Sequence, residues 1–347
     1  MKKKWLTKVC CVGMAMTMLS GCGSNASQTA DADVAESETV AESTESVSET
    51  PATEEIAEEA TEAADEENYE TGDASLDLYR NEDGIGENEL LVVSFGTSYN
   101  DSRRLTIGAI ENKLEESFPG YSVRRAFTSQ IIIDHVKSRD GYEIDNVQEA
   151  LQRAADNGVK NLVVQPTHLM DGYEYNDLVE EIAEYADAFE SVSIGSPLLT
   201  DDEDYQKVIE AITTATKEYD DKETAICFMG HGTSADSNGV YAKMQEMLTD
   251  AGYENYYIGT VEASPSVEDV LASVQQGDYK KVVIEPLMIV AGDHANNDMA
   301  GDEDGSWKRV FEDAGYEVTC LVKGLGEMPE IQDLIVEHAK EAMPKQE

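Results

Sequence analysis

The sequence predicts an α/β protein built from two similar Rossmann-like domains with parallel sheets and a cleft between them. Beyond residue 88, short apolar runs alternate with amphipathic stretches at the interval typical of strands and helices. The chain also repeats itself, because VVQPTHLMDGYEYND (163–177) aligns without a gap with VIEPLMIVAGDHANN (283–297). Parallel sheets related in this way would bring the carboxyl ends of their strands to a shared cleft, where ligands of open α/β sheets usually bind.

Net charge narrows the range of partners. The 347 residues include 72 acidic and 25 basic side chains, which gives a formal net charge of −47. Such a surplus repels phosphate backbones and anionic lipid headgroups. We therefore expect no nucleic-acid partner, and contact with a membrane only through a lipid anchor.

The first 22 residues have the pattern of an export signal. A lysine-rich start precedes an apolar run from Val9 to Leu19, which is about half of the ~20 residues that a membrane-spanning helix needs. The following Leu-Ser-Gly-Cys resembles the bacterial lipobox, in which the cysteine carries the lipid. We expect residues 1–22 to be a lipoprotein signal peptide, Cys22 to be lipidated, and the folded part to lie outside the cytoplasm, anchored to the membrane.

Residues 23–88 are rich in Ser, Thr, Ala, Glu and Asp and have few large apolar side chains. A segment of this composition cannot bury enough apolar surface to offset its ordering entropy. The sequence therefore predicts a disordered acidic tether over this range.

The folded part divides into an N-terminal half, 89–215, and a C-terminal half, 216–347. Within the N-terminal half, the helical pattern of 146–158 has apolar residues at Val147, Leu151 and Ala154. VVSFGTS (92–98) matches ICFMGHGTS (226–234), which extends the repeat to the first strand of each half. The predicted strands cover residues 89–96, 121–127, 161–166, 191–197, 224–230, 256–261, 281–290 and 318–322.

Two cysteines remain in the folded part. Cys227 lies in an apolar run and is predicted to be buried. A disulfide to Cys320 and two free thiols both fit an exported protein, so the sequence leaves their redox state open.

Two of the five histidines stand out by position. His231 and His294 each follow a strand pattern beside a glycine, and in the repeat they fall opposite Phe95 and Glu174. Glu262 ends a predicted strand between them. Two imidazoles and a carboxylate at strand ends would suit a divalent transition metal and leave open coordination positions, although a hydrogen-bonded histidine at a strand end is an equally good interpretation.

The two other histidines considered are expected on helices. His135 is predicted to lie on a helix face, and His338 on the surface of the last helix.

Several motifs together resemble those of the anaerobic cobalt chelatases of the CbiK type. They are SFGTSYNDSRR, RAFTS, GHGTS, TVEASPSVEDV and EPLMIVAGDHANNDMAGDEDGSWK. These enzymes are class II chelatases that share a two-domain fold with ferrochelatase. The resemblance implies a lyase that inserts Co²⁺ into sirohydrochlorin, with the metal as a substrate and no organic cofactor. A His/His/Glu set does not separate Co²⁺ from Fe²⁺ or Ni²⁺.

The resemblance also assigns roles to residues. His231, Glu262 and His294 correspond to the metal ligands of the family, with His231 as the proton acceptor. Glu174 corresponds to a further carboxylate facing the cleft and is a second catalytic candidate.

Basic residues that flank the motifs are candidates for binding the substrate carboxylates, the alternative being ordinary surface charges. They are Arg103, Arg104 and Arg125, with Arg124, Lys308 and Arg309 as further candidates.

The export signal conflicts with a cytoplasmic biosynthetic role. It leaves an alternative function, that of a lipoprotein that binds and delivers haem, another tetrapyrrole or a metal outside the cytoplasm. A homo-oligomer is compatible with the sequence, which does not fix the oligomeric state.

Overall fold

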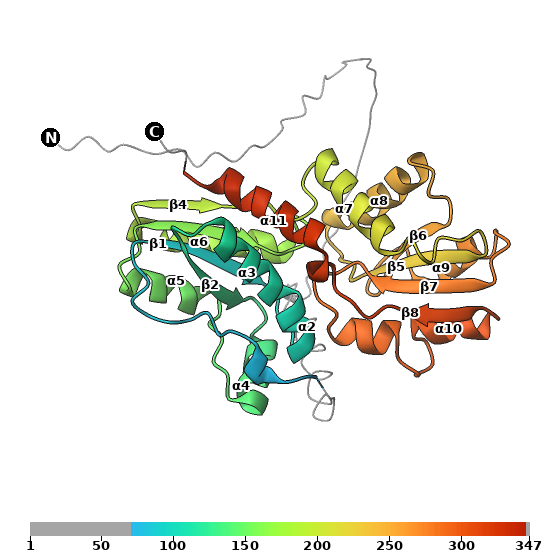
Figure 1. Ribbon diagram of the computed structural model, residues 1–347, viewed down its shortest axis with the longest axis horizontal. Coiled ribbons are helices and arrows are strands. Elements are labelled where there is room, and N and C mark those ends of the chain that lie inside the picture. The colour runs from blue at the N-terminus through green and yellow to red at the C-terminus, as the bar shows by residue number, and fades with distance from the viewer. Residues whose placement is uncertain (1–70, 345–347) are drawn as a thin grey trace, which may run out of the picture. The chain divides into compact units, whose positions relative to one another are not determined.

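The computed structural model describes residues 71–344 (Figure 1). The predicted signal peptide, the lipidation site Cys22 and the tether up to residue 70 lie outside the described residues. Within 71–344, no helix is both long enough and apolar enough to cross a bilayer.

The N-terminal half is built on a parallel sheet with strand order β2-β1-β3-β4. Its strands are β1 (Asn88–Ser94), β2 (Ser122–Phe127), β3 (Asn161–Pro166) and β4 (Ser191–Ile194). Its helices are α2 (Asn100–Leu105), α3 (Ile107–Ser117), α4 (Gln130–Asp140), α5 (Val147–Asp156), α6 (Tyr173–Tyr185) and the 3₁₀ turn η2 (Ala186–Ala188).

The C-terminal half repeats this arrangement with strand order β6-β5-β7-β8, again all parallel. Its strands are β5 (Thr224–Gly230), β6 (Tyr256–Thr260), β7 (Lys281–Pro286) and β8 (Glu317–Cys320). Its helical elements are η3 (Asp236–Asn238), α8 (Gly239–Asp250), α9 (Val267–Val274), the π-helix η4 (Ala295–Met299), α10 (Trp307–Asp313) and η5 (Leu325–Glu327).

Strand register confirms the internal repeat. Pro166 of β3 pairs with Val93 of β1, and Pro286 of β7 pairs with Met229 of β5, so the two prolines close equivalent central ladders. The predicted fold class is therefore confirmed. Five predicted strands end too late. The largest difference is in 281–290, because the chain leaves the sheet after Pro286 and Val290 packs instead against an apolar cluster that includes Ile107 and Phe127 of the other half.

The last helix of each half packs toward the other half. Helix α7 (Asp202–Ala215) contacts α8, while α11 (Pro329–Ala342) contacts α3, β3 and β4 of the N-terminal half (Figure 1). One apolar core accordingly runs through both halves. A division at 215/216 therefore follows the sequence repeat but does not separate two independent packing units.

His338 of α11 is buried, and its Nε2 lies 3.0 Å from Asp204 Oδ1 of α7. The prediction that His338 lies at the surface is therefore wrong. The reason is that α11 is covered by elements distant in sequence. His135 does lie on α4, as predicted.

The predicted tether, residues 23–88, is too long at its C-terminal end, because residues from 71 onward contact the N-terminal half. Residues 71–80, here called the strap, include the 3₁₀ turn η1 (Ala74–Leu76) and contact the N-terminal half. Asp101 N–H donates to the Thr71 carbonyl at 2.8 Å, and Arg125 N–H donates to the Arg80 carbonyl at 3.2 Å. The folded part thus includes residues 71–88. Polar contacts and ion pairs hold the strap, so the shortage of apolar residues concealed it.

Cys227 and Cys320 are both free thiols. Each is paired in register with Ile284 of the intervening strand β7, Cys227 from β5 and Cys320 from β8. Two neighbouring strands are ~4.8 Å apart, so two cysteines with a strand between them exceed the ~7 Å reach of a disulfide. The sheet therefore settles the redox state that the sequence left open.

Candidate active site

His231 and His294 come together at the carboxyl ends of β5 and β7. Their imidazole rings meet edge to face, with centroids 4.8 Å apart and an interplanar angle of 80°. Gly232 makes the tight exit from β5, because its φ is +93° and a Cβ there would lie 2.8 Å from the Ala263 backbone nitrogen. Two imidazoles at this separation can share one small ligand.

Hydrogen bonds set the tautomer of both rings. His231 Nδ1 lies 2.8 Å from the Gly232 carbonyl oxygen, and His294 Nδ1 lies 2.7 Å from Asp298 Oδ2. Because a carbonyl or carboxylate oxygen only accepts, each Nδ1 carries the proton and the lone pair of each neutral ring lies on Nε2. The His294–Asp298 pair is the arrangement that orients metal-binding imidazoles.

The backbone places Glu262 beside His231, because Glu262 N–H donates to the His231 carbonyl at 2.8 Å. The Glu262 side chain is exposed. Across residues 71–344, no three His, Cys, Asp or Glu side chains are grouped closely enough to hold a metal ion. The structure thus brings the two predicted histidines together, while the carboxylate of Glu262 does not complete a three-ligand cluster.

Glu174 lies in the first turn of α6 and is paired with His168, a histidine for which no role was expected. Glu174 Oε2 is 3.4 Å from His168 Nε2, and the His168 side chain is 6% exposed. Neither ring nitrogen of His168 has a hydrogen-bond partner within residues 71–344. The sequence feature that could have singled out His168 is its position shortly after β3. In the repeat, the corresponding residue after β7 is Met288.

Loops of the two halves touch at symmetry-related glycines. A Cβ at Gly292 would lie 3.1 Å from Thr97 Oγ1, and a Cβ at Gly172 would lie 3.4 Å from Ser237 Oγ. His294 follows Gly292 by two positions, as Glu174 follows Gly172. The histidine pair and the His168–Glu174 pair therefore sit on the inter-half loops of opposite halves.

The expected substrate-binding arginines require a correction. The side chains of Arg103 and Arg125 are each 1% exposed, and both contact Asp77 Oδ2 at 2.7 Å. Arg125 also pairs with the fully buried Glu111 at 2.7 Å. These guanidinium groups are covered and neutralised, so they are not available to a ligand in the cleft.

Arg104 differs, because its side chain is 34% exposed and forms an ion pair with Asp101 at 3.2 Å. Of the three arginines first proposed, it keeps access to solvent.

Two paired parallel sheets, with two imidazoles at the carboxyl edge of one of them, define an α/β protein built from two similar halves with a candidate metal-binding site. Residues 88–344 match the family model described as cobalt chelatase (CbiK). The chain belongs to this family, which confirms the family recognised from its motifs.

Two relatives agree with this assignment. The sirohydrochlorin cobaltochelatase of Salmonella typhimurium is 38% identical over 254 residues, covering 73% of this chain and 96% of the relative. The sirohydrochlorin cobaltochelatase CbiKC of Nitratidesulfovibrio vulgaris is 30% identical over 256 residues, covering 73% of this chain and 90% of the relative.

Solved structures agree on the fold. SirB from Bacillus subtilis with Fe³⁺ has a TM-score of 0.53 at 14% identity, covering 74% of this chain and 96% of that one. The sirohydrochlorin chelatase SirB from Bacillus subtilis subspecies spizizenii in complex with cobalt has a TM-score of 0.51 at 14% identity, covering 74% and 95%. At this identity the likeness concerns the fold alone.

Proposed function

We propose that this chain is a sirohydrochlorin cobaltochelatase, a lyase that inserts Co²⁺ into the tetrapyrrole sirohydrochlorin. The observation that carries the proposal is the His231–His294 pair, with both Nδ1 atoms engaged, in a member of the cobalt chelatase family. Co²⁺ is a substrate here, and no organic cofactor enters the reaction.

The metal-binding step uses the two Nε2 lone pairs. His231 and His294 hold the ion. Glu262, whose backbone N–H is bonded to the His231 carbonyl, is the proposed third ligand; its exposed side chain would have to turn toward the histidine pair to reach the ion and offset part of the metal charge. Imidazole and carboxylate ligands release a divalent ion more readily than a thiolate cage does, which the transfer to the macrocycle requires.

Proton transfer balances the reaction. Two pyrrole N–H protons must leave as the divalent ion enters, so two acceptors are needed. His231 accepts one proton at Nε2 once the ion has moved to the macrocycle. Glu174, backed by the buried His168, accepts the other from the opposite half.

The substrate carboxylates need local cations on a strongly acidic chain. Arg104 is the proposed contact among the three arginines, because Arg103 and Arg125 are fully engaged with buried carboxylates.

The proposal extends to location: the chain is exported and is anchored to the membrane through a lipid on Cys22. The lipobox-like Leu-Ser-Gly-Cys supports it. Labelling cells with a fatty acid and comparing the wild-type chain with Cys22→Ala tests it, since the variant should lose both the label and the membrane fraction.

The function is tested by mixing the purified full chain with Co²⁺ and sirohydrochlorin without oxygen and following the absorbance of the macrocycle. We expect protein-dependent conversion to the cobalt complex. An unchanged spectrum together with tight haem binding would contradict the chelatase function and favour a role in tetrapyrrole delivery.

A further inference from the structure

We propose that Asp77, in the strap of residues 71–80, is a positioning residue for the loop that carries His294. This inference rests on the proposed function of the His231–His294 site. The family match begins at residue 88, so it does not cover the strap.

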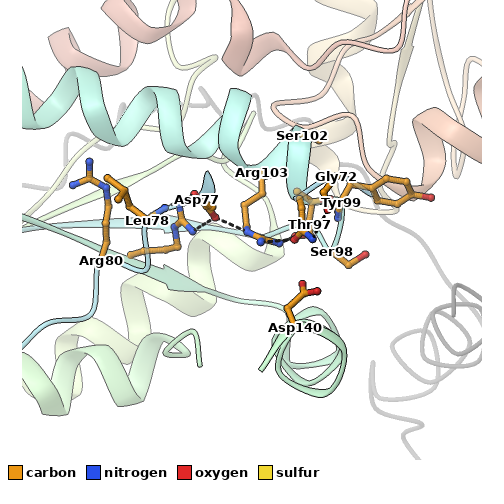
Figure 2. A network of polar contacts seen from close by, with 12 residues as sticks. Gly72, Asp77, Leu78, Arg80, Thr97, Ser98, Tyr99, Ser102, Arg103 and Asp140 are labelled. Atoms are coloured by element: carbon orange, nitrogen blue, oxygen red, sulfur yellow. Dashed lines mark hydrogen bonds and ion pairs between the residues drawn. The ribbon is translucent and has the colours of Figure 1, made fainter. Parts of the chain in front are cut away.

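The strap is fixed to the N-terminal half at both of its ends and in the middle. Thr71 accepts from Asp101 N–H at 2.8 Å, and Gly72 accepts from Asn100 Nδ2 at 3.2 Å. In the middle, Asp77 reaches between Arg103 and Arg125, and Figure 2 shows the Asp77 carboxylate directed at Arg103. The Asp77 side chain is 6% exposed, so the strap buries a charge in the N-terminal half.

Asp77 balances the charge of Arg103. Its Oδ2 is 2.7 Å from Arg103 Nε, whereas the other hydrogen-bond acceptors of Arg103 within residues 71–344 are the Thr97 carbonyl and the Asn100 side-chain oxygen, both neutral. Burial alone would raise the pKa of Asp77, but the hydrogen bonds and charges of Arg125 and Arg103 outweigh it and hold that pKa below its usual range. Removing Asp77 would leave a buried guanidinium without its contacting carboxylate.

Helix α2 carries the effect toward the site. Arg103 donates to the Thr97 carbonyl at 3.2 Å in the loop after β1. On the same short helix, Ser102 Oγ accepts from Ala291 N–H at 2.9 Å across the two halves. Thr97 also lies close to Gly292, because a Cβ added at Gly292 would be 3.1 Å from Thr97 Oγ1.

These contacts act on the start of the loop that leads to His294. Ala291 and Gly292 precede His294 by three and two positions. Asp77 therefore positions Arg103, and Arg103 positions α2 and the loop that contains Thr97. Helix α2 and this loop in turn contact the chain at Ala291 and Gly292. A loosened α2 would misplace the Nε2 of His294 relative to His231 while leaving both imidazoles present.

The test compares Asp77→Asn with Asp73→Asn in the full chain. Asp73 is a matched control, because it is an exposed strap carboxylate that caps η1 through Ser75 N–H. For Asp77→Asn we expect the KM for Co²⁺ to rise about tenfold while the KM for sirohydrochlorin stays within about twofold, because only one metal ligand is misplaced. Asp73→Asn should match the wild type in both.

A second variant covers failure of Asp77→Asn to fold. Ser102→Ala removes no charge and only breaks the hydrogen bond to Ala291, so it should raise the KM for Co²⁺ about threefold and add little in the Asp77→Asn background, as expected for coupled residues. A folded Asp77→Asn or Ser102→Ala chain with the wild-type KM for Co²⁺ would overturn the proposal.

Failure of the proposed function would look different. A wild-type chain that inserts no cobalt would refute the chelatase activity alone. The strap would then be tested by direct Co²⁺ titration of the histidine pair followed by visible absorption, where Asp77→Asn should weaken binding about tenfold. Equal binding by Asp77→Asn and the wild type would overturn the strap proposal.

Discussion

His294 Nδ1 donates a 2.7 Å hydrogen bond to Asp298 Oδ2, one turn further along the chain. The pair lies where the π-helix η4 begins, with His294 at its N-cap and Asp298 inside it. A π-helical turn changes the direction of side chains relative to an α-helix and is frequent at functional sites. In this chain it places Asp298 at Nδ1 of the imidazole that meets the His231 ring edge to face.

Asp298→Asn should weaken Co²⁺ binding about tenfold, because carboxylates behind metal-binding histidines usually contribute 10- to 100-fold to affinity. The measurement is a Co²⁺ titration of the full chain followed by visible absorption. Asp302→Asn in the same segment is the control, since Asp302 pairs with Lys308 at the surface. Equal affinities for the two variants would contradict the assigned role of Asp298.

His168→Leu should slow cobalt insertion about tenfold while leaving Co²⁺ affinity unchanged, because His168 backs Glu174 and not the histidine pair. Insertion rates and Co²⁺ titrations are compared for His168→Leu and His135→Gln, the latter altering a histidine of α4. A loss of metal binding in His168→Leu would show that His168 supports the metal site instead.

Glu285→Gln should change how stability depends on pH. Burial raises the pKa of Glu285 from 4.5 to about 7, with Glu327 adding to the shift and Lys323 opposing it. The folded state then keeps a proton that the unfolded state has lost, so wild-type stability falls as pH rises from about 4.5 to about 7. The equivalent position in the N-terminal half holds the neutral Gln165.

The Gln substitution removes this titration. From pH 4 to pH 8, the free energy of unfolding of the variant should therefore rise by about 3 kcal/mol relative to that of the wild type. Urea unfolding at the two pH values measures the gain. Glu317→Gln at an exposed position of β8 is the control. Parallel pH profiles for Glu285→Gln and the wild type would contradict the assignment.

The free thiols lead to a fourth prediction: adding a reductant should leave the midpoint of thermal unfolding unchanged. Burial raises the pKa of Cys320 to about 11 and raises that of Cys227 further, so both thiols should react slowly with alkylating reagents at pH 8. Peptide mapping without reduction, which checks the pairing, should find Cys227 and Cys320 unlinked.

The sequence was sufficient to predict the sheets and the repeat, and it placed His231 and His294 at strand ends; their joint role as metal ligands was expected from the resemblance to the cobalt chelatases. Buried parallel strands leave continuous apolar runs, and the repeat marks equivalent strand ends such as Pro166 and Pro286. His231 and His294 follow β5 and β7, which are neighbouring parallel strands of one sheet, so both side chains lie at the same edge of that sheet.

Contacts between segments distant in sequence were not predictable. A charged residue is expected at the surface unless its partner is known. The sequence therefore did not indicate that Arg103, Arg125 and Asp77 form a buried network. The burial of His338 depends on α7, which lies far from α11 in the sequence. In each case a single sequence lacks the pairing information on which the burial depends.

Cobalt insertion by His231→Ala, measured beside the wild type with circular dichroism to verify the fold, tests the role of the histidine pair. The wild type should convert sirohydrochlorin to its cobalt complex. The folded variant should lose at least about 100-fold in rate, because it lacks both a metal ligand and a proton acceptor. Turnover at the wild-type rate in folded His231→Ala would contradict the account.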